Sequence, residues 1–156
     1  DKIVVGTGLW VAPNGKMIRG LAEQIVKKWG SQFLVGAVDY DDDGIVCVGH
    51  GRTAIGRSAA ERARELADAG CGEILLTSIK RDGSLEGYDL RTLAAVAKAV
   101  DVPVVVSGGC GAWEHMQAAF DAGADGAATT CIFHFTDGAM KACKHWLVEH
   151  DAEVRP

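Results

Sequence analysis

The sequence predicts an α/β fold with one mostly parallel sheet, because short apolar runs alternate with amphipathic stretches of about 10 to 15 residues. A second observation is a weak internal repeat: Asp68–Glu73 and Asp121–Gly126 both close a helix with Ala-Gly and then enter a strand. The third is that polar residues collect directly after the apolar runs. A repeated barrel and a doubly wound sheet both fit these observations. We expect about five βα units in a single domain, or part of one, that covers residues 1–156.

The first strand is expected at Ile3–Val5, where three branched apolar residues follow one another. A helix is expected at Lys16–Lys28, because apolar side chains recur there at the helical period. The apolar run Phe33–Val38 predicts a second strand that is covered on both faces, as strands of parallel sheets are.

A short hairpin and a capped helix are expected next. Three aspartates and Gly44 form a turn signal after the second strand, and Ile45–Val48 returns from that turn as a hairpin strand. Ser58 begins a helix that continues to Ala69, because Glu61 three residues later completes a capping box.

The rest of the chain alternates strand and helix, with the period of the apolar residues changing from one to the other. The expected strands are Glu73–Leu76, Val102–Val106 and Gly126–Thr129. The expected helices are Leu90–Ala99, Ala112–Asp121 and Gly138–Glu149.

The composition argues against several classes of function. The net charge of −5 and the absence of a basic run predict no nucleic-acid partner. The longest apolar stretches are too short to span a membrane, so we expect no membrane partner. The five cysteines contain no CxxC pair and the five histidines have no ligand spacing, so we predict no disulfide framework, no metal site and no cofactor. Reduced thiols fit a cytoplasmic protein.

The segment Ser107–Gly111 is the strongest physical signal for a ligand. Its glycines let the backbone approach an anion closely, and the helix expected from Ala112 directs free N–H groups toward it. Thr129 and Thr130 follow the neighbouring strand, so two adjacent loops can form one phosphate site. The alternative is a tight glycine turn that binds no ligand.

Other polar residues support two interpretations each. Asp39 follows an apolar run at the edge where parallel α/β sheets bind ligands, so it is either a general acid or base or a turn residue. Asp82 also fits a plain type I turn. Lys2 and Glu73 lie at strand starts, hence at the opposite edge, where a charged pair is more often a structural bridge than a site.

Several longer motifs resemble the cyclase subunit of imidazole glycerol phosphate synthase, a family of histidine biosynthesis. The longest are GEILLTSIKRDGS at residues 72–84, GYDL at residues 87–90 and PVVVSGGCG at residues 103–111. Shorter ones are GSQ at residues 30–32, WEH at residues 113–115, and AGAD at residues 122–125 leading to IFHF at residues 132–135. The likeness covers essentially the whole chain, in order, from the family's fourth strand to its C-terminus.

The resemblance implies a partial (βα)8 TIM barrel, strands four to eight, which is incomplete on its own because a whole barrel needs about 250 residues. It implies a lyase-type cyclase that uses ammonia to form imidazole glycerol phosphate from a phosphoribosyl-formimino aminoimidazole carboxamide ribotide. In the family, a glutamine amidotransferase subunit supplies the ammonia. The implied roles are catalysis for Asp39, substrate binding for Thr77 and Ser107, phosphate binding for Gly6, Thr7, Asp82, Gly83, Gly108, Gly109, Thr130 and Cys131, and an ammonia gate for Lys2 and Glu73.

The chain also departs from the family's pattern. Gly6 stands in place of an Asn, Lys80 of an Asp and Cys131 of a Ser, and the connection after Asp39 looks shortened. The first three and a half βα units are absent, and with them the family's first catalytic aspartate, so we expect the isolated chain to be inactive. The alternative function is a non-catalytic half-barrel that binds phosphate compounds. An unclosed parallel sheet exposes apolar edges, so we expect a homo-oligomer if the 156 residues are the entire protein.

Overall fold

The computed structural model describes residues 1–9, 19–135 and 140–154. The strands are β1 (Ile3–Val5), β2 (Leu34–Tyr40), β3 (Ile45–Val48), β4 (Thr53–Ser58), β5 (Glu73–Ser78), β6 (Val104–Ser107) and β7 (Gly126–Ala128). The helices are α1 (Arg19–Trp29), α2 (Ala59–Asp68), α3 (Leu90–Ala97), α4 (Trp113–Asp121), α5 (Cys131–Phe135) and α6 (Met140–Glu149). Short 3-10 turns lie at Thr7–Leu9 and Ser31–Phe33.

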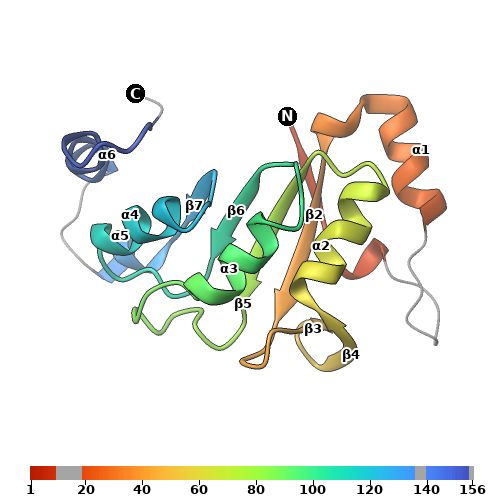
Figure 1. The fold of residues 1–156 in the computed structure, drawn as a ribbon, viewed down its shortest axis with the longest axis horizontal. Coiled ribbons are helices and arrows are strands. Elements are labelled where there is room, and N and C mark those ends of the chain that lie inside the picture. Colours follow the sequence, from red (N-terminus) through yellow and green to blue (C-terminus); the bar gives the residue numbers. More distant parts are fainter. Residues whose placement is uncertain (10–18, 136–139, 155–156) are drawn as a thin grey trace.

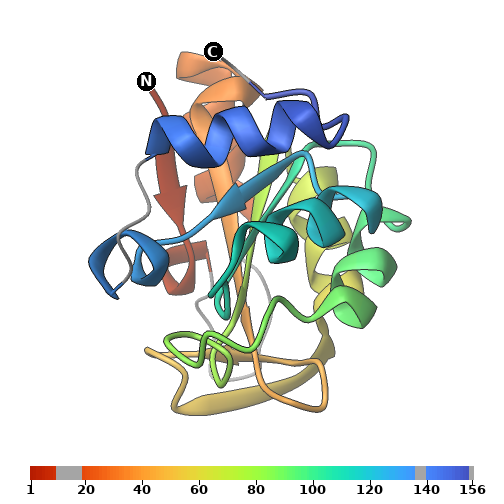
Figure 2. The same cartoon turned by 90° about the vertical axis from the view of Figure 1, so that its left-hand side faces the viewer.

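The parallel part of the sheet has the strand order β1-β2-β5-β6-β7, and the hairpin of β3 and β4 extends antiparallel from the end of β2. Figure 1 shows α2 and α3 in front of these strands, and Figure 2 shows α2, α3 and α4 gathered on one side of the sheet. This is the α/β architecture of part of a TIM barrel. Within the described residues β1 and β7 do not pair with each other, so the barrel is not closed.

The helix-covered face of the sheet carries the core. Val38 on β2 and Ile74 and Leu76 on β5 are fully buried, and burying each such side chain contributes about 1.5–3 kcal/mol. Gly36 lies so close to α2 that a Cβ there would come within 2.9 Å of a Leu66 methyl group. Because side chains alternate along a strand, the residues between these belong to the other face.

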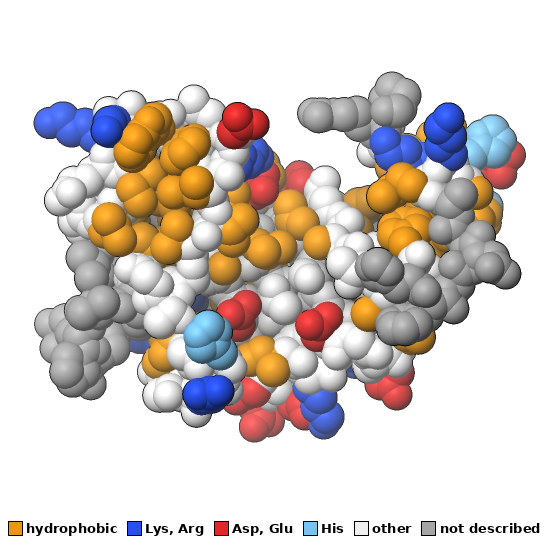
Figure 3. Space-filling model, turned by 180° about the vertical axis from the view of Figure 1, so that it is seen from behind, with side chains coloured by type: hydrophobic (Ala, Val, Ile, Leu, Met, Phe, Trp, Pro, Cys, Tyr) orange, Lys and Arg blue, Asp and Glu red, His pale blue; other side chains and the backbone are white. Residues whose placement is uncertain are grey.

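In the middle of the strands that other face is apolar, and none of the described elements covers it. The strand registers place Ala37 beside Leu75, and Leu75 beside Val105. Val4, on β1, is 56% exposed. Figure 3 shows hydrophobic side chains gathered on this side of the molecule, and none of the described helices lies over it in Figures 1 and 2. In a closed barrel these residues would face the interior.

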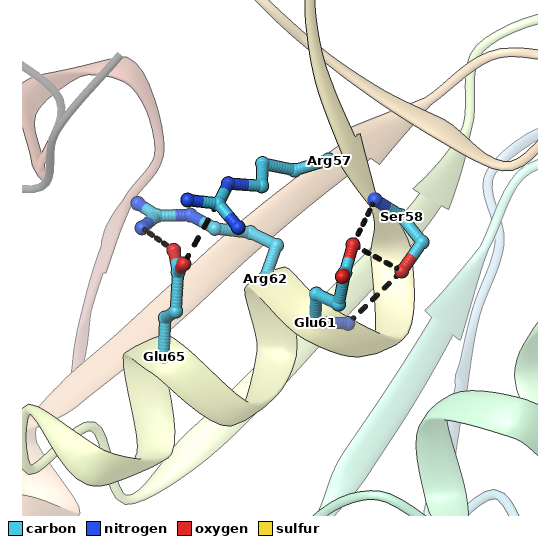
Figure 4. A network of polar contacts seen from close by, with 5 residues as sticks. All are labelled: Arg57, Ser58, Glu61, Arg62 and Glu65. Atoms are coloured by element: carbon cyan, nitrogen blue, oxygen red, sulfur yellow. Dashed lines mark hydrogen bonds and ion pairs between the residues drawn. The ribbon is translucent and has the colours of Figure 1, made fainter.

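The start of α2 confirms the predicted capping box (Figure 4). Ser58 Oγ accepts a hydrogen bond from the Glu61 amide at 3.2 Å, and the Glu61 carboxylate accepts one from the Ser58 amide at 2.9 Å. Further along the helix, Arg62 is fully buried with its Nη1 3.4 Å from Glu65 Oε2, and Arg57 approaches the same carboxylate at 3.9 Å. Burial lowers the pKa of Arg62 to about 10, so this guanidinium stays charged at neutral pH.

The predicted elements are confirmed apart from a few boundaries and two omissions. β2 continues to Tyr40, so Asp39 lies within the strand, and Phe33 belongs to the preceding turn. β4 was not predicted, because its six residues are exposed or half-buried and show no apolar alternation. The five-residue helix α5 is too short to give a periodic signal. Residues 16–18 and 138–139 of the predicted helices lie outside the described residues.

Candidate functional site

Three of the predicted site residues form one row across the sheet. Asp39 on β2 is the register partner of Thr77 on β5, and Thr77 is the partner of Ser107 on β6. All three are half-buried and lie at the carboxyl ends of their strands. Because neighbouring strands are about 4.8 Å apart, the row places one carboxyl and two hydroxyl groups within about 10 Å of one another.

The environment of Asp39 suits proton transfer. Burial raises the pKa of this carboxyl above its usual value, because desolvation disfavours the charged form. Such a carboxyl holds a proton closer to neutral pH and can both donate and accept it. The nearby Cys47 thiol has its pKa raised as well, by burial first and then by the charges of Asp41 and Asp39. It therefore stays protonated and is a poor nucleophile.

A pocket of about 140 Å³ adjoins this row at the ends of β6 and β7. Its lining consists of Asp82, Ser107, Gly108, Gly109, Cys110, Ala128, Thr129, Thr130 and Cys131. The structure thus brings together the phosphate-binding residues predicted after the last three parallel strands, except Gly83. The two adjacent loops that the sequence predicted, after β6 and β7, form most of this pocket, and Asp82 joins them from the loop after β5.

The two glycines of the pocket are required by chain packing. Gly108 and Gly109 have φ angles of 90° and 105°, which favour glycine. A Cβ at Gly108 would lie 2.6 Å from the Ser78 carbonyl oxygen, and one at Gly109 would lie 2.2 Å from that of Gly87. The Gly87 amide also donates to the Gly109 carbonyl at 2.7 Å. This loop therefore packs tightly on the loop after β5, whether or not an anion binds.

The helices near the pocket contribute differently from what the sequence suggested. α4 begins at Trp113, and its N-cap Ala112 makes no side-chain cap bond. The pocket lining reaches Cys110 but does not include Ala112. The Gly111 amide donates to His115 Nδ1 at 3.1 Å. The helix that does contribute a lining residue is the unpredicted α5, which begins at Cys131.

The other predicted phosphate position, at Gly6 and Thr7, follows β1 and is separate from the pocket. A Cβ at Gly6 would lie 3.5 Å from Ala37 Cβ, so Gly6 borders the uncovered face. Thr7 Oγ1 accepts a hydrogen bond from the Gly49 amide at 3.1 Å. Since β2 and β5 lie between β1 and β6, the two positions suit the two ends of an elongated ligand.

The tip of the β3–β4 hairpin, residues 49–51, is a part of this rim that the sequence did not identify. Gly49 contacts Thr7 after β1, as described, and a Cβ at Gly51 would lie 3.3 Å from the side chain of Ile79 after β5. The tip therefore bridges the segments that follow two different strands. Its sequence signal is the triplet Gly-His-Gly, which predicts no site because it follows no parallel strand.

Two ion pairs link segments that are distant in sequence. Lys2 and Glu73 form one at the amino ends of the strands, at the edge opposite the row and the pocket. Lys80 and Asp42 form the other, between the loop after β5 and the turn after β2, where both side chains are exposed. Asp42 thus provides an ion-pair partner for Lys80, the lysine that stands in place of the family's Asp.

Other kinds of site find no support in the described residues. Among them, no group of three His, Cys, Asp or Glu side chains is placed to hold a metal ion. The five cysteines are free thiols. No helix in the described part of the chain is both long and apolar enough to cross a membrane.

Comparisons with known proteins agree with this geometry. The family model described as "Histidine biosynthesis protein" matches residues 1–138. The imidazole glycerol phosphate synthase subunit HisF of Clostridium botulinum is 41% identical over 161 residues, covering 99% of this chain and 61% of the relative. The subunits HisF of Chlorobium phaeobacteroides and Chlorobium luteolum are each 38% identical over 159 residues, with the same coverage. The chain spans 61% of the length of these curated relatives.

Proposed function

Since the chain belongs to the family of histidine biosynthesis proteins, we propose that it forms part of an ammonia-dependent cyclase. The reaction is the formation of imidazole glycerol phosphate from a phosphoribosyl-formimino aminoimidazole carboxamide ribotide. The relatives are named as subunits of imidazole glycerol phosphate synthase, which supports this reaction and a second subunit beside it. A cytoplasmic location follows from such a role and stays a prediction.

The observation that carries the proposal is the row of Asp39, Thr77 and Ser107 beside the small pocket at the ends of β6 and β7. The pocket holds one phosphate of the substrate, through the backbone around Gly108 and Gly109 and the hydroxyl of Thr130. Thr77 and Ser107 contact the body of the substrate. Asp39, whose pKa is raised by burial, exchanges a proton with the ring that closes.

Ammonia enters from the opposite edge in this proposal. Glu73 and Thr77 lie on the same strand and the same face, four residues and therefore about 13 Å apart. On this face, the side chains that lie between the row of Glu73 and the row of Thr77, such as Leu75 and Val105, are apolar and let a neutral molecule pass. The ion pair of Lys2 and Glu73 then acts as a gate, and a glutamine amidotransferase binds at that edge.

The test is the rate of ammonia-dependent cyclisation by the natural protein and by an Asp39→Asn variant. We expect the substitution to lower kcat at least about hundredfold, as for loss of a general acid or base. Asp43→Asn is the matched control, because Asp43 is an exposed carboxylate in the turn four residues later. Equal activity of the two variants would exclude the catalytic role of Asp39.

The alternative function is a self-associating half-barrel that binds phosphate compounds without turnover. The apolar face around Val4, Leu75 and Val105 favours it, because a second copy would cover this face. Binding of inorganic phosphate by residues 1–156 without cyclisation, in an oligomer, would support this alternative. Turnover that depends on Asp39 would exclude it.

A further inference from the structure

The tip of the β3–β4 hairpin crosses the end of β2. β2 lies between β1 and β5 in the sheet, and the tip contacts the segments that follow both of these neighbours. Thr7 holds the Gly49 amide on one side, and Ile79 packs near Gly51 on the other. Figure 2 shows the hairpin extended across this end of the sheet. The residue between the two contacts is therefore held over the strand that carries Asp39.

That residue is His50, which is one of three consecutive residues with a left-handed backbone conformation. Gly49, His50 and Gly51 all have left-handed φ angles, of 63°, 61° and 77°. A glycine at position 50 would adopt this conformation with less strain than a histidine does. The imidazole is exposed, and it makes no hydrogen bond or ion pair with any of the described residues. A strained position that retains a functional side chain without a structural partner points to a ligand.

We propose that His50 is a substrate-binding residue that contacts the phosphate group held at Gly6 and Thr7. This inference rests on the proposed function and extends it to the tip of the β3–β4 hairpin. Thr7 Oγ1 uses a lone pair to accept from the Gly49 amide, which leaves the hydroxyl proton free to donate to a phosphate oxygen. The same contact fixes the hairpin tip beside Thr7, and His50 is the next residue along the chain after the amide that contacts this hydroxyl.

The arrangement also explains how two phosphate positions are distinguished. The pocket at β6 and β7 binds through the backbone of a glycine loop, with Asp82 as its charged lining residue. At Thr7 the neighbouring hairpin tip carries His50, and Arg52 follows the tip in the sequence. Three strand spacings separate β1 from β6, about 14 Å along the sheet, so one phosphate cannot occupy both positions.

The experiment is a titration of the natural protein with inorganic phosphate, followed by the NMR shifts of backbone amides at both positions. Wild-type protein should show separate saturation at Thr7 and Gly49 and at Gly108 and Gly109. We expect His50→Gly to raise the apparent Kd at Thr7 about tenfold, the effect of losing one hydrogen bond to an anion. The Kd at Gly108 should stay unchanged.

The control is His145→Gln, which alters an exposed histidine that faces Glu149 on α6 and should change neither Kd. His50→Gly relaxes the backbone, so loss of the fold does not complicate the result. Unchanged affinity at Thr7 in His50→Gly, with normal binding at Gly108, would overturn the role of His50 and leave the phosphate pocket standing. Absence of shifts at both positions in the wild type would overturn both proposals.

Discussion

Substituting alanine for Gly109 is expected to destabilise the protein far more than the same substitution at Gly83. Both glycines are left-handed, with φ angles of 105° and 80°, so an alanine at either position carries backbone strain of about 1 kcal/mol. At Gly83 a Cβ would meet nothing within 4 Å. At Gly109 it would lie 2.2 Å from the Gly87 carbonyl oxygen, a distance that requires one loop to move.

The movement has a cost that follows from the contacts. It weakens the hydrogen bond from the Gly87 amide to the Gly109 carbonyl, worth about 1 kcal/mol, and overpacking of this kind adds about 1–3 kcal/mol. We therefore expect a loss in the free energy of unfolding of about 3–5 kcal/mol for Gly109→Ala and about 1 kcal/mol for Gly83→Ala.

Urea denaturation of both variants, compared with the wild type, measures this difference. Gly109→Ala should also weaken the binding of inorganic phosphate, since the displaced loop forms one wall of the pocket. Equal losses for the two variants would refute the argument, because the close approach to Gly87 would then have no energetic consequence.

Two further predictions concern the cap of α2 and the site carboxyl. Ser58→Ala should lower the free energy of unfolding by about 1 kcal/mol in urea denaturation, because it removes the side-chain acceptor of the Glu61 amide; no loss would mean that the box does not stabilise the helix. Asp39→Asn should be at least as stable as the wild type at pH 7. Folding raises the pKa of the Asp39 carboxyl above its usual value near 3.8, so the free energy of unfolding falls as the pH rises above 3.8 and this carboxyl loses its proton. Asparagine has no proton to lose at this position, so the variant does not show this decrease. The difference should disappear in unfolding curves below that pH, and a less stable variant at pH 7 would contradict the assigned direction.

The local elements could be predicted because their signals lie within a few residues of each other. Ser58 and Glu61 are three residues apart, and the cap they form is the one predicted. The row of Asp39, Thr77 and Ser107 also follows from the sequence, since polar residues after parallel strands meet at one edge. β4 could not be predicted in this way, because its exposed side chains carry no alternation.

The details of the site depend on contacts between distant segments. Nothing near Gly109 in sequence indicates that the Gly87 carbonyl lies against it, so the glycine pattern left both an anion site and a tight turn open. The contact of Gly49 with Thr7 joins segments 42 residues apart, and no periodicity reports it. Five of the residues that the motif resemblance implies for phosphate binding, Asp82, Gly108, Gly109, Thr130 and Cys131, line one pocket, and their role stays a prediction. The contacts of the hairpin tip required the three-dimensional arrangement.

The uncovered face leads to a last prediction, which concerns self-association of residues 1–156. Val4 on this face and Val148 on α6 are 56% and 57% exposed, so the two side chains are matched in exposure. If the apolar face is what a second copy covers, a lysine at position 4 would bring its charge into a desolvated interface, whereas a lysine at position 148 would remain in water.

Sedimentation equilibrium of the purified 156-residue chain should show an oligomer for the wild type and for Val148→Lys. Val4→Lys should raise the dissociation constant of the oligomer at least about tenfold relative to the wild type. A tenfold change in this constant corresponds to about 1.4 kcal/mol, and burying an unpaired charge costs more than this. A monomeric wild type would show that the exposed face alone does not drive association. Equal weakening by the two lysines would mean that the contact lies elsewhere, because only position 4 belongs to the face that a closed barrel would bury.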